Sequence, residues 1–420
     1  GVARLVKFAK AGSANVIYTM GVVDDAADDK FKMFQRTTPL SGTWIASSGS
    51  TSANARSENL FIEYKDIIYG LRTGSIIWGY NTSNNVFTDT AYSLATAFSA
   101  LTVPVAALVH SKDDQLYIGY DNVIVKKNAG AVDANWSTIA TNLPSGQVIT
   151  DFAEYGNYIA IATRPKVTGG KSVLYLWDRD STLTTLTESV NWGNESLELI
   201  EEIDGYIVGI STQVSGAADI YEPKLLFKMW ATGLPGAKLI QEFPLGSLTI
   251  TFGGKQKQGN RMYFMMSAST RAQSFYTNTA ATDFTVRDGV FSYGRSGDGS
   301  FALAIHQLLN NDTSITTPVP KGFLLYGNVL FVAYTAAGTY VANVTDNSTP
   351  YDAATGVYES LVLNGGDSDL TKKLVGATLM FEPLPPSSTV VLRYKADAET
   401  SFITIFSHTT LNSVSRGAQN

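Results

Sequence analysis

The sequence predicts an all-β protein built from a repeated unit, and three observations support that prediction. The chain of 420 residues has 44% hydrophobic and 16% charged residues, which is enough apolar surface for a core. Its apolar stretches are short and are separated by Asn, Asp and Gly, the residues that tight hairpin turns favour. One type of apolar hexamer also recurs at roughly 50-residue intervals, which is typical of a repeat architecture.

The repeated hexamer occurs seven times, and each time a turn signal stands before it. The copies are VIYTMG from Val16, IIYGLR from Ile67, LYIGYD from Leu116, YIAIAT from Tyr158, YIVGIS from Tyr206, MYFMMS from Met262 and LFVAYT from Leu330. The turn signals include Lys65-Asp66, Gly156-Asn157 and Asp204-Gly205. Because another apolar stretch precedes each turn, as in ITDFAEY and LELIEEI, each repeat is expected to begin with a β-hairpin.

Two further stretches complete each repeat. A third apolar stretch follows every hexamer, as in VLYLWDR and LLFKMWA, and a weaker fourth follows in WSTIA from Trp136, AKLIQEF from Ala237 and VYESLVL from Val357. The hexamers are almost continuously apolar, as strands are when both faces of their sheet are covered. Four antiparallel strands in roughly 50 residues form one blade of a β-propeller. Residues 1–366 therefore resemble the β-propeller architecture, and we expect seven four-stranded blades.

Some stretches depart from this pattern. TAYSLATAFSAL, residues 90–101, has helical spacing, and residues 267–285 are expected to form a long loop between strands. Residues 367–420 are expected to form a separate β segment, part of a β-sandwich, with three strands between 374 and 406. An open strand such as STVVLRYK tends to pair with any nearby backbone. We therefore expect this segment to contact a neighbouring chain or to lead into a further domain.

Composition excludes several classes of function. A net charge of −6 without runs of Lys or Arg argues against a nucleic-acid-binding face. The absence of cysteine excludes disulfides, thiolate metal sites and a cysteine nucleophile. The apolar stretches are much shorter than the roughly 20 residues that a membrane helix needs, so no membrane span is expected.

Residues with catalytic or metal-binding chemistry are few. The three histidines, His110, His306 and His408, stand in apolar or turn contexts without a G-x-S-x-G motif, so structural roles are expected for them. The loop VVDDAADDK is a weak candidate for a cation site, because hard cations bind clustered carboxylates, and a solvated acidic loop is its alternative. Its acidic residues are Asp24, Asp25, Asp28 and Asp29. Asp367 and Asp369 form a weaker candidate of the same kind, and no cofactor is expected.

A second set of residues would suit a glycan-active propeller. Glu63, Asp151 and Glu202 are predicted on or beside inner strands, where a pair of carboxylates could hydrolyse a glycosidic bond. SGDGSF, residues 296–301, resembles the Asp-box turn of sialidase-like propellers but lacks one residue of it, so a structural hairpin turn is favoured. The arginines of such an enzyme would be Arg72, Arg164 and Arg295, and their alternative is an ordinary solvated role.

The aromatic residues have two possible roles. Surface tyrosines and phenylalanines could stack on sugar rings in a lectin, but most of the tyrosines lie inside the strand stretches, which favours packing in the core. Trp78, Trp177 and Trp230 each close the third stretch of a repeat. They are expected to pack between adjacent blades.

Three functions remain open from the sequence. Loosely similar blades, long Ser/Thr/Asn/Gly-rich loops and the FEPLP…VVLRYK strands resemble the propeller domains of nozzle and adaptor proteins of bacteriophage tails. The resemblance implies a non-enzymatic structural protein of the virion, binding copies of itself and neighbouring virion proteins and letting DNA pass without specific binding. The alternatives are a glycosidase and a glycan-binding lectin, either of which would be secreted or at the cell surface.

Overall fold

The protein is described by a computed structural model of the whole chain, which divides into two compact units. We call residues Gly1–Thr345 the propeller unit and residues Asp346–Asn420 the C-terminal unit. The structure describes residues 4–11, 16–25, 28–36, 45–46, 61–72, 76–93, 106–127, 140–167, 169–180, 186–213, 224–244, 250–268, 289–296, 299–308, 319–326, 329–336, 339–344, 377–381, 389–394, 401–409 and 415–419.

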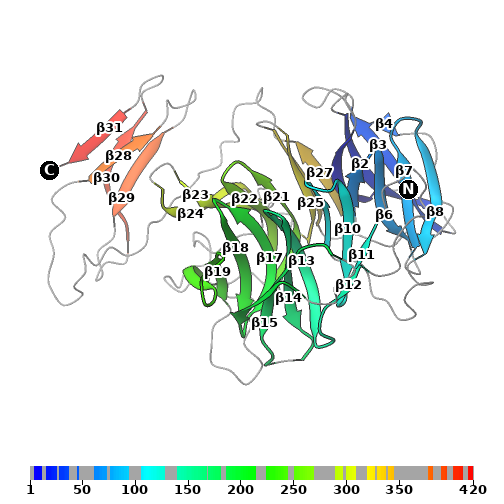
Figure 1. Cartoon of the computed structure of the whole chain (residues 1–420). Coiled ribbons are helices and arrows are strands. Elements are labelled where there is room, and N and C mark those ends of the chain that lie inside the picture. Colours follow the sequence, from blue (N-terminus) through cyan, green and yellow to red (C-terminus); the bar gives the residue numbers. More distant parts are fainter. Residues whose placement is uncertain are drawn as a thin grey trace. The chain divides into compact units, whose positions relative to one another are not determined.

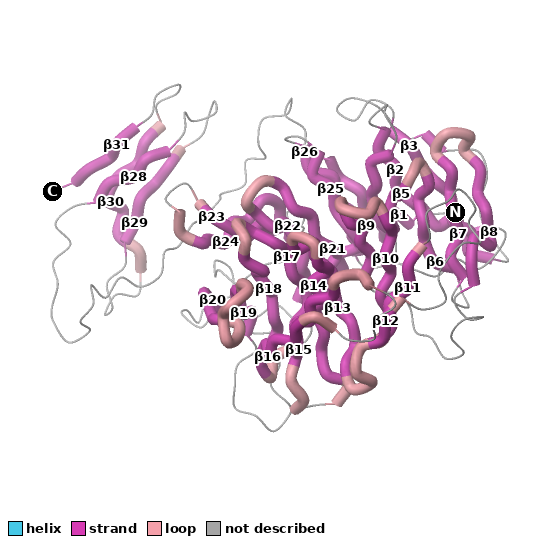
Figure 2. The backbone as a smooth tube through the Cα atoms, viewed as in Figure 1, coloured by secondary structure: helices cyan, strands magenta, loops and turns pink. Residues whose placement is uncertain are grey.

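The propeller unit consists of antiparallel sheets, each made of consecutive strands (Figures 1 and 2). The first three sheets contain β1 (Arg4–Ala11), β2 (Val16–Asp25), β3 (Asp28–Arg36) and β4 (Ile45–Ala46); β5 (Phe61–Tyr64), β6 (Ile67–Arg72), β7 (Ile76–Asn81) and β8 (Val86–Ser93); and β9 (Ala106–His110), β10 (Gln115–Tyr120), β11 (Val123–Lys126) and β12 (Thr141–Asn142).

The later sheets repeat this order. They contain β13 (Gln147–Tyr155), β14 (Tyr158–Pro165), β15 (Ser172–Trp177) and β16 (Glu188–Gly193); β17 (Ser196–Ile203), β18 (Tyr206–Gln213), β19 (Lys224–Trp230) and β20 (Lys238–Pro244); β21 (Ile250–Gln258), β22 (Arg261–Ala268), β23 (Gly289–Arg295) and β24 (Phe301–Leu308); and β25 (Val319–Tyr326), β26 (Val329–Ala336) and β27 (Thr339–Val344).

The repeated hexamers occupy equivalent positions in these sheets, as the sequence predicted. All seven lie on the second strand of their sheet, from β2 to β26. The hairpin turns before them also have the backbone that their residues suggest. Lys65 and Asp66 have φ of 51° and 62°, and Asp204 and Gly205 have φ of 52° and 80°. This left-handed backbone matches the twist of a tight hairpin and suits Asp and Gly.

The sheets pack face to face in a closed order, which makes the propeller. Among the described residues, the core consists of five apolar clusters, each formed by two consecutive sheets. First strands contact one another from sheet to sheet, as β9, β13 and β17 do, so they line the centre of the unit. Strand β1 contacts both β5 and β25, which brings the first and last sheets together. Among the described residues, no sheet of the propeller unit combines a strand from the start of the unit with strands from its end.

The predicted count of seven four-stranded blades does not hold for the described residues. Six sheets have four strands, and the sheet of β25, β26 and β27 has three. Strands β4 and β12 span only two residues each. The fourth strand expected from Val357 lies outside the described residues, and β12 begins at Thr141, directly after the WSTIA stretch. The outermost strand has one neighbour and little buried surface, so its sequence carries the weakest pattern.

Two other expectations fall largely outside the described residues. In the stretch predicted to be helical, residues 90–93 belong to strand β8, while residues 94–101 are not described. Most of the predicted loop 267–285 is not described either. The compact units divide at 345/346, whereas the sequence placed the change at 366/367, within residues that are not described. That boundary stays a prediction.

Three buried tryptophans test the expectation that they pack between adjacent sheets. Trp177 is fully buried and meets Tyr117 of the preceding sheet edge to face, with ring centroids 5.6 Å apart. Trp230 is also buried and packs with residues of the preceding sheet. These two residues confirm the predicted inter-blade role. Trp78 is buried as well, and its nearest described partners, Gly70 and Phe61, belong to its own sheet.

The C-terminal unit contains two strand pairs. Strands β28 (Ala377–Phe381) and β31 (Ser415–Gln419) pair with each other, and β29 (Val390–Tyr394) pairs with β30 (Ile403–His408). The first three of these in chain order are the strands predicted between 374 and 406, with β30 ending two residues later. Strand β31 was not predicted. Val391, Phe402 and Ile403 are exposed on this unit.

Candidate functional site

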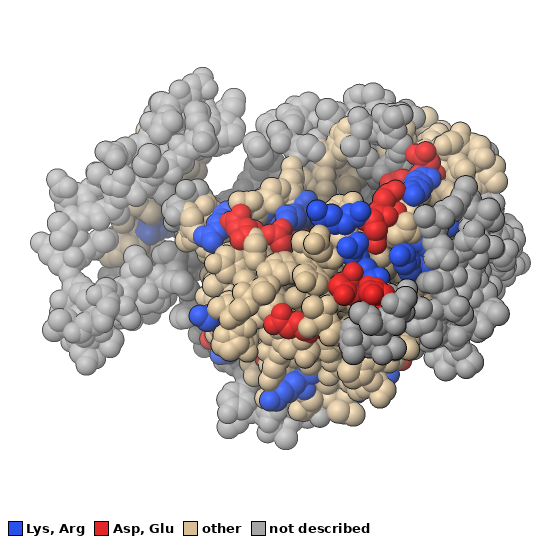
Figure 3. Space-filling model, in the orientation of Figure 1, with Lys and Arg blue, Asp and Glu red and all other residues tan. Residues whose placement is uncertain are grey.

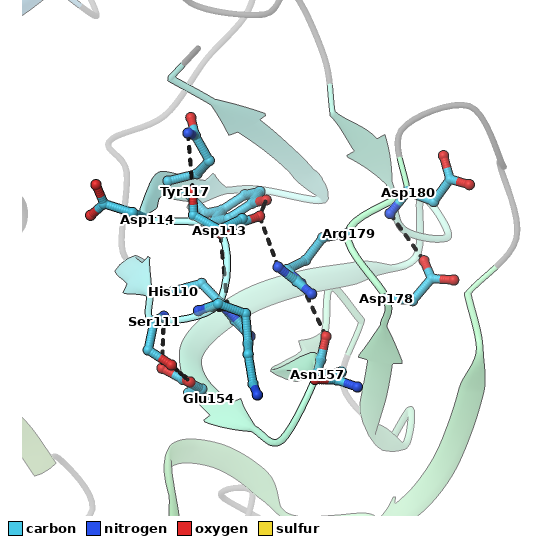
Figure 4. Close-up of polar contacts among 12 residues, drawn as sticks. His110, Ser111, Asp113, Asp114, Tyr117, Glu154, Asn157, Asp178, Arg179 and Asp180 are labelled. Carbon is cyan, nitrogen blue, oxygen red and sulfur yellow. Dashed lines mark hydrogen bonds and ion pairs between the residues drawn. The ribbon is translucent and has the colours of Figure 1, made fainter. Parts of the chain in front are cut away.

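Two groups of polar side chains stand out in the propeller unit, and the first joins the β9–β12 sheet to the β13–β16 sheet (Figure 4). We call it the His110 cluster, and it comprises His110, Ser111, Asp113, Tyr117, Glu154 and Arg179. Arg179 Nη1 lies 2.9 Å from Asp113 Oδ2, and the Tyr117 hydroxyl donates to the same oxygen at 2.6 Å. Arg179 also donates from Nε to the carbonyl of Asn157 at 3.0 Å. The guanidinium therefore ties the hairpin turns of two neighbouring sheets together.

Arg179 has an unusual backbone for this role. Its φ is 71°, in the left-handed region that long side chains rarely adopt. Its loop is held in place because Trp177 Nε1 donates to the carbonyl of Asp180 at 3.2 Å. The Asp113 ion pair and the Asn157 hydrogen bond compensate for the cost of this conformation.

The histidine of the cluster does not form a catalytic triad. The side chain of His110 is completely buried, and its Nδ1 accepts a hydrogen bond from the main-chain N–H of Lys112 at 3.2 Å. The neighbouring hydroxyl of Ser111 donates to Glu154, and the Ser111 N–H donates to the same carboxylate. The serine is therefore engaged by Glu154, with no bond to the imidazole. This arrangement agrees with the structural role expected for His110.

The second group, the axial cluster, lies on three neighbouring first strands, β13, β17 and β21, and its centre is Lys255. The ammonium of Lys255 is 2.8 Å from Asp151 Oδ2 and 3.3 Å from Glu201 Oε2. It also donates to the carbonyls of Phe152 and Ile200. Asp151 Oδ2 also accepts a hydrogen bond from the main-chain N–H of Ile200, at 2.9 Å. One buried ammonium thus connects three sheets through four oxygens.

Burial and charge act against each other in the axial cluster. Burial raises the pKa of Asp151 above its ordinary value, although Lys255 and the Ile200 N–H lower it. Burial lowers the pKa of Lys255, but the two carboxylates raise it more, so the ammonium keeps its proton more tightly than a free lysine. Lys255 is therefore a fixed positive charge at neutral pH.

A groove of about 410 Å³ opens beside the axial cluster. Its charged lining residues are Glu154, Glu201, Glu202, Lys255 and Lys257, and Ala107, Leu108 and Phe152 contribute apolar surface. Lys257 pairs with Glu202, whose other oxygen accepts the N–H of Gly205 at 2.6 Å. Burial raises the pKa of the Glu202 carboxyl, but Lys257 and the Gly205 N–H lower it by more than burial raises it. The carboxyl therefore remains ionised well below neutral pH.

The structure brings together some of the predicted carboxylates and separates others. Asp151 and Glu202 lie on the neighbouring first strands β13 and β17, while Glu63 lies on β5. Glu63 accepts the N–H of Asp66 at 2.9 Å, in the same way that Glu202 holds its own hairpin turn. Burial raises the pKa of Glu63. Glu63 is thus a turn-stabilising residue with no described contact to the other two.

The remaining candidates give no joint site among the described residues. Asp24 pairs with Asp29, and Asp25 with Asp28, across the β2–β3 hairpin, but their side chains are not described. Asp367 and Asp369 lie outside the described residues. In the part of the chain that is described, no cluster of three metal-binding side chains occurs.

Arg295 and the SGDGSF stretch have structural partners. Arg295 pairs with Asp204 at 2.6 Å and donates to the carbonyl of Gly299. Gly299 has a φ of 84° in the turn between β23 and β24, which confirms the hairpin interpretation of SGDGSF. Arg164 is exposed on β14, and the side chain of Arg72 is not described. His306 Nε2 lies 2.8 Å from the hydroxyl of Ser292, and His408 lies on β30.

Charges of opposite sign alternate over one face of the molecule (Figure 3). Ion pairs that connect neighbouring sheets include Lys65–Asp114 at 3.0 Å and Lys166–Asp121 at 2.8 Å. Such mixed charge differs from the continuous basic surface that phosphate binding requires. Among the described residues, no helix has the length and apolar character needed to cross a membrane.

Sequence reasoning missed the two cations that organise these groups, Arg179 and Lys255. Each lies in a stretch whose pattern predicts an ordinary exposed position for a charged residue. Arg179 follows a strand end, and Lys255 alternates with other polar residues in GGKQKQG. The partners of both are distant in sequence, so local pattern carried no signal for them.

The comparisons with known proteins concern the fold alone. No protein-family model matches the chain, and no curated protein matches it. The extracellular domain of a hybrid two-component system from B. thetaiotaomicron is similar with a TM-score of 0.51 and 12% identity, over 91% of this chain and 42% of that one. A puromycin-hydrolysing peptidase of Mycobacterium tuberculosis gives a TM-score of 0.52 and 8% identity, over 83% and 51%. The chain thus spans about half the length of these proteins or less.

Proposed function

We propose that this chain is a non-enzymatic structural and interaction protein, a component of a virion tail that forms a ring or an adaptor. The observation that carries the non-enzymatic part is the state of the inner-strand carboxylates. Asp151 and Glu201 are bound by Lys255, and Glu202 is bound by Lys257 and a main-chain N–H. A general acid or base must be free to exchange its proton with the substrate, and these carboxylates are committed to holding sheets together.

The virion setting rests on the sequence resemblance to propeller domains of bacteriophage tail proteins. Its partners would be further copies of the chain and neighbouring virion proteins. The exposed Val391, Phe402 and Ile403 of the C-terminal unit fit such contacts, because exposed apolar residues on strands favour association. The alternating charges of the propeller unit would let DNA pass without a salt-dependent grip.

Cryo-electron microscopy of intact particles tests this proposal. An antibody fragment raised against the purified protein would mark the chain, and several copies arranged around the tail axis are expected. Cross-linking within the same particles should join residues 374–406 to a neighbouring chain. A protein that no particle contains, and that is a free monomer with residues 374–406 folded onto its own propeller unit, would overturn the tail proposal.

A glycan-binding or glycan-hydrolysing role is the second candidate, because carboxylates of two neighbouring first strands, β13 and β17, border one groove. A glycan array and a panel of chromogenic glycosides distinguish it from the first. Binding or turnover that is lost in Glu202→Gln but kept in Glu63→Gln would favour the glycan role. No binding by the folded wild-type protein would favour the structural role.

A further inference from the structure

We propose that the His110 cluster is an acid-sensitive latch between the β9–β12 and β13–β16 sheets. Closed at neutral pH, the latch loosens when His110 takes up a proton. This role is independent of the proposed virion setting, because it rests on contacts inside one chain.

The first step of the argument is the position of the imidazole. His110 ends β9 with a relative exposure of 0%, and its Nδ1 is an acceptor for the Lys112 N–H. Since Nδ1 accepts, the neutral ring carries its hydrogen on Nε2. A second proton must go to Nδ1. It would remove the hydrogen bond from Lys112 and place a full charge where water does not reach.

The second step concerns the charges around the ring. Asp113 Oδ1 lies 3.9 Å from Nδ1, while the other oxygen of the same carboxylate holds Arg179 and Tyr117. Glu154, on β13, faces the ring as well, and the main chain of Tyr158 borders it from β14. A charged His110 is repelled by the Arg179 guanidinium, which is bound to the same carboxylate. The Asp113–Arg179 pair joins the two sheets, so this repulsion weakens the junction.

The third step is the direction of the pH dependence. Burial and Arg179 lower the pKa of His110 more than Glu154, Asp113 and Tyr158 raise it. Burial raises the pKa of Asp113, but Tyr117 and Arg179 lower it more, so Asp113 keeps its charge in the same range. An opened junction exposes His110 and restores a pKa of about 6.5. The open state then binds the proton first, and the closed latch loses stability as the pH falls below that value.

Hydrogen–deuterium exchange at pH 7.5, 6.5 and 5.5, corrected for intrinsic exchange rates, tests the latch in the full chain. Peptides covering residues 106–120 and 155–163 report the junction, and a peptide covering β18, residues 206–213, serves as the internal reference. The opening equilibrium of the junction should rise by up to about tenfold per pH unit below pH 6.5, as one linked proton requires. The reference peptide should change less.

Variants separate His110 from the other histidines. His110→Gln should remove the pH dependence at the junction, whereas His408→Gln, in the C-terminal unit, should leave it unchanged. An exchange profile that is independent of pH in the wild type, or that is the same in His110→Gln, would overturn the proposal.

A measurement on the wild-type protein covers the case in which His110→Gln does not fold. With 13C-labelled histidine, the three imidazole signals can be titrated by NMR, and His306→Gln and His408→Gln assign the signal of His110 by elimination. That signal should titrate below pH 6.5, together with the loss of protection at the junction. A His110 midpoint at or above 6.5 would contradict the latch.

Discussion

At the scale of single residues, Lys255 connects three sheets at the centre of the propeller unit. It is 16% exposed and supplies the positive charge for two carboxylates that are each 13% exposed. A buried ion pair often adds little compared with an apolar replacement of both partners. Removing one partner alone leaves an uncompensated buried charge and is far more costly.

Replacing Lys255 with Met should therefore reduce the free energy of unfolding by about 3–5 kcal/mol. Lys257→Met is the matched control, because Lys257 lies two residues further along β21, is 38% exposed and pairs with Glu202. Lys257→Met should reduce the free energy of unfolding by about 0–1 kcal/mol. Urea denaturation at pH 7 measures both, and equal losses in the two variants would contradict the assignment of Lys255.

The Lys255→Met variant should regain part of its stability in acid. Burial already raises the pKa of Asp151 in the presence of Lys255, and removal of the ammonium raises it further. A group with a raised folded-state pKa stabilises the fold below its unfolded value and loses that contribution as the pH rises. The difference between wild type and Lys255→Met should thus shrink as the pH falls from 7 towards 4. A difference that is constant over this range would show that lost packing, not charge, causes the defect.

At the scale of elements, neighbouring sheets fit together where an aromatic ring lies against a glycine of a second strand. A Cβ atom on Gly119 would come within 2.4 Å of Phe152 Cζ in the next sheet, and one on Gly209 within 2.4 Å of Trp192 Cζ2. Both glycines hold the fourth position of their hexamer. In these two copies, the glycine of the hexamer therefore allows close approach between sheets.

Gly119→Ala should destabilise the protein by about 1–3 kcal/mol, because the added methyl group overlaps the ring of Phe152. Gly146→Ala is the control, since a Cβ there has no atom within 4 Å. That control should be neutral or slightly stabilising, by up to about 1 kcal/mol, through reduced freedom of the unfolded chain. Thermal unfolding followed by circular dichroism compares them. Partial rescue of Gly119→Ala by Phe152→Leu would locate the clash.

The aromatic side of such contacts should be equally sensitive. Trp177→Ala removes a fully buried ring between two sheets and should cost about 3–5 kcal/mol of unfolding free energy. Val167→Ala, at a residue with 69% exposure, should stay within about 0.5 kcal/mol of the wild type. A loss below about 1 kcal/mol for Trp177→Ala, accompanied by lost sugar binding, would favour the lectin role.

The sequence predicted the elements that depend on local pattern. First, second and third strands, their hairpin turns and the burial of Trp177 and Trp230 all followed from periodicity and turn chemistry. The sequence predicted the fourth strands less accurately, because an edge strand such as β12 has little apolar pattern. The polar clusters could not be predicted at all. Asp151 and Lys255, or Asp113 and Arg179, meet only after the sheets have packed, and Trp192 gains its role from a glycine on β18.

At the scale of the whole molecule, the net charge is −6, and several charges of the described residues lie in ion pairs. Neutralising the phosphates of a duplex requires clustered Lys and Arg, whose counterion release gives the affinity its strong salt dependence. We therefore expect duplex DNA to stay unbound in a gel-shift assay at both 50 and 200 mM salt. A shifted band at the lower salt that disappears at the higher one would contradict this and indicate a basic surface.

Because every described sheet of the propeller unit is made of consecutive strands, no strand of that unit has to wait for a partner from the far end of the chain. During synthesis, each sheet can complete its hydrogen-bond ladder soon after its own residues leave the ribosome, and then dock on the sheet made before it. The contact between β1 and the β25–β27 sheet must await the last part of the propeller unit. The growing chain would thus expose unfinished apolar faces on its first and its newest sheet, which limits the chance of aggregation during translation.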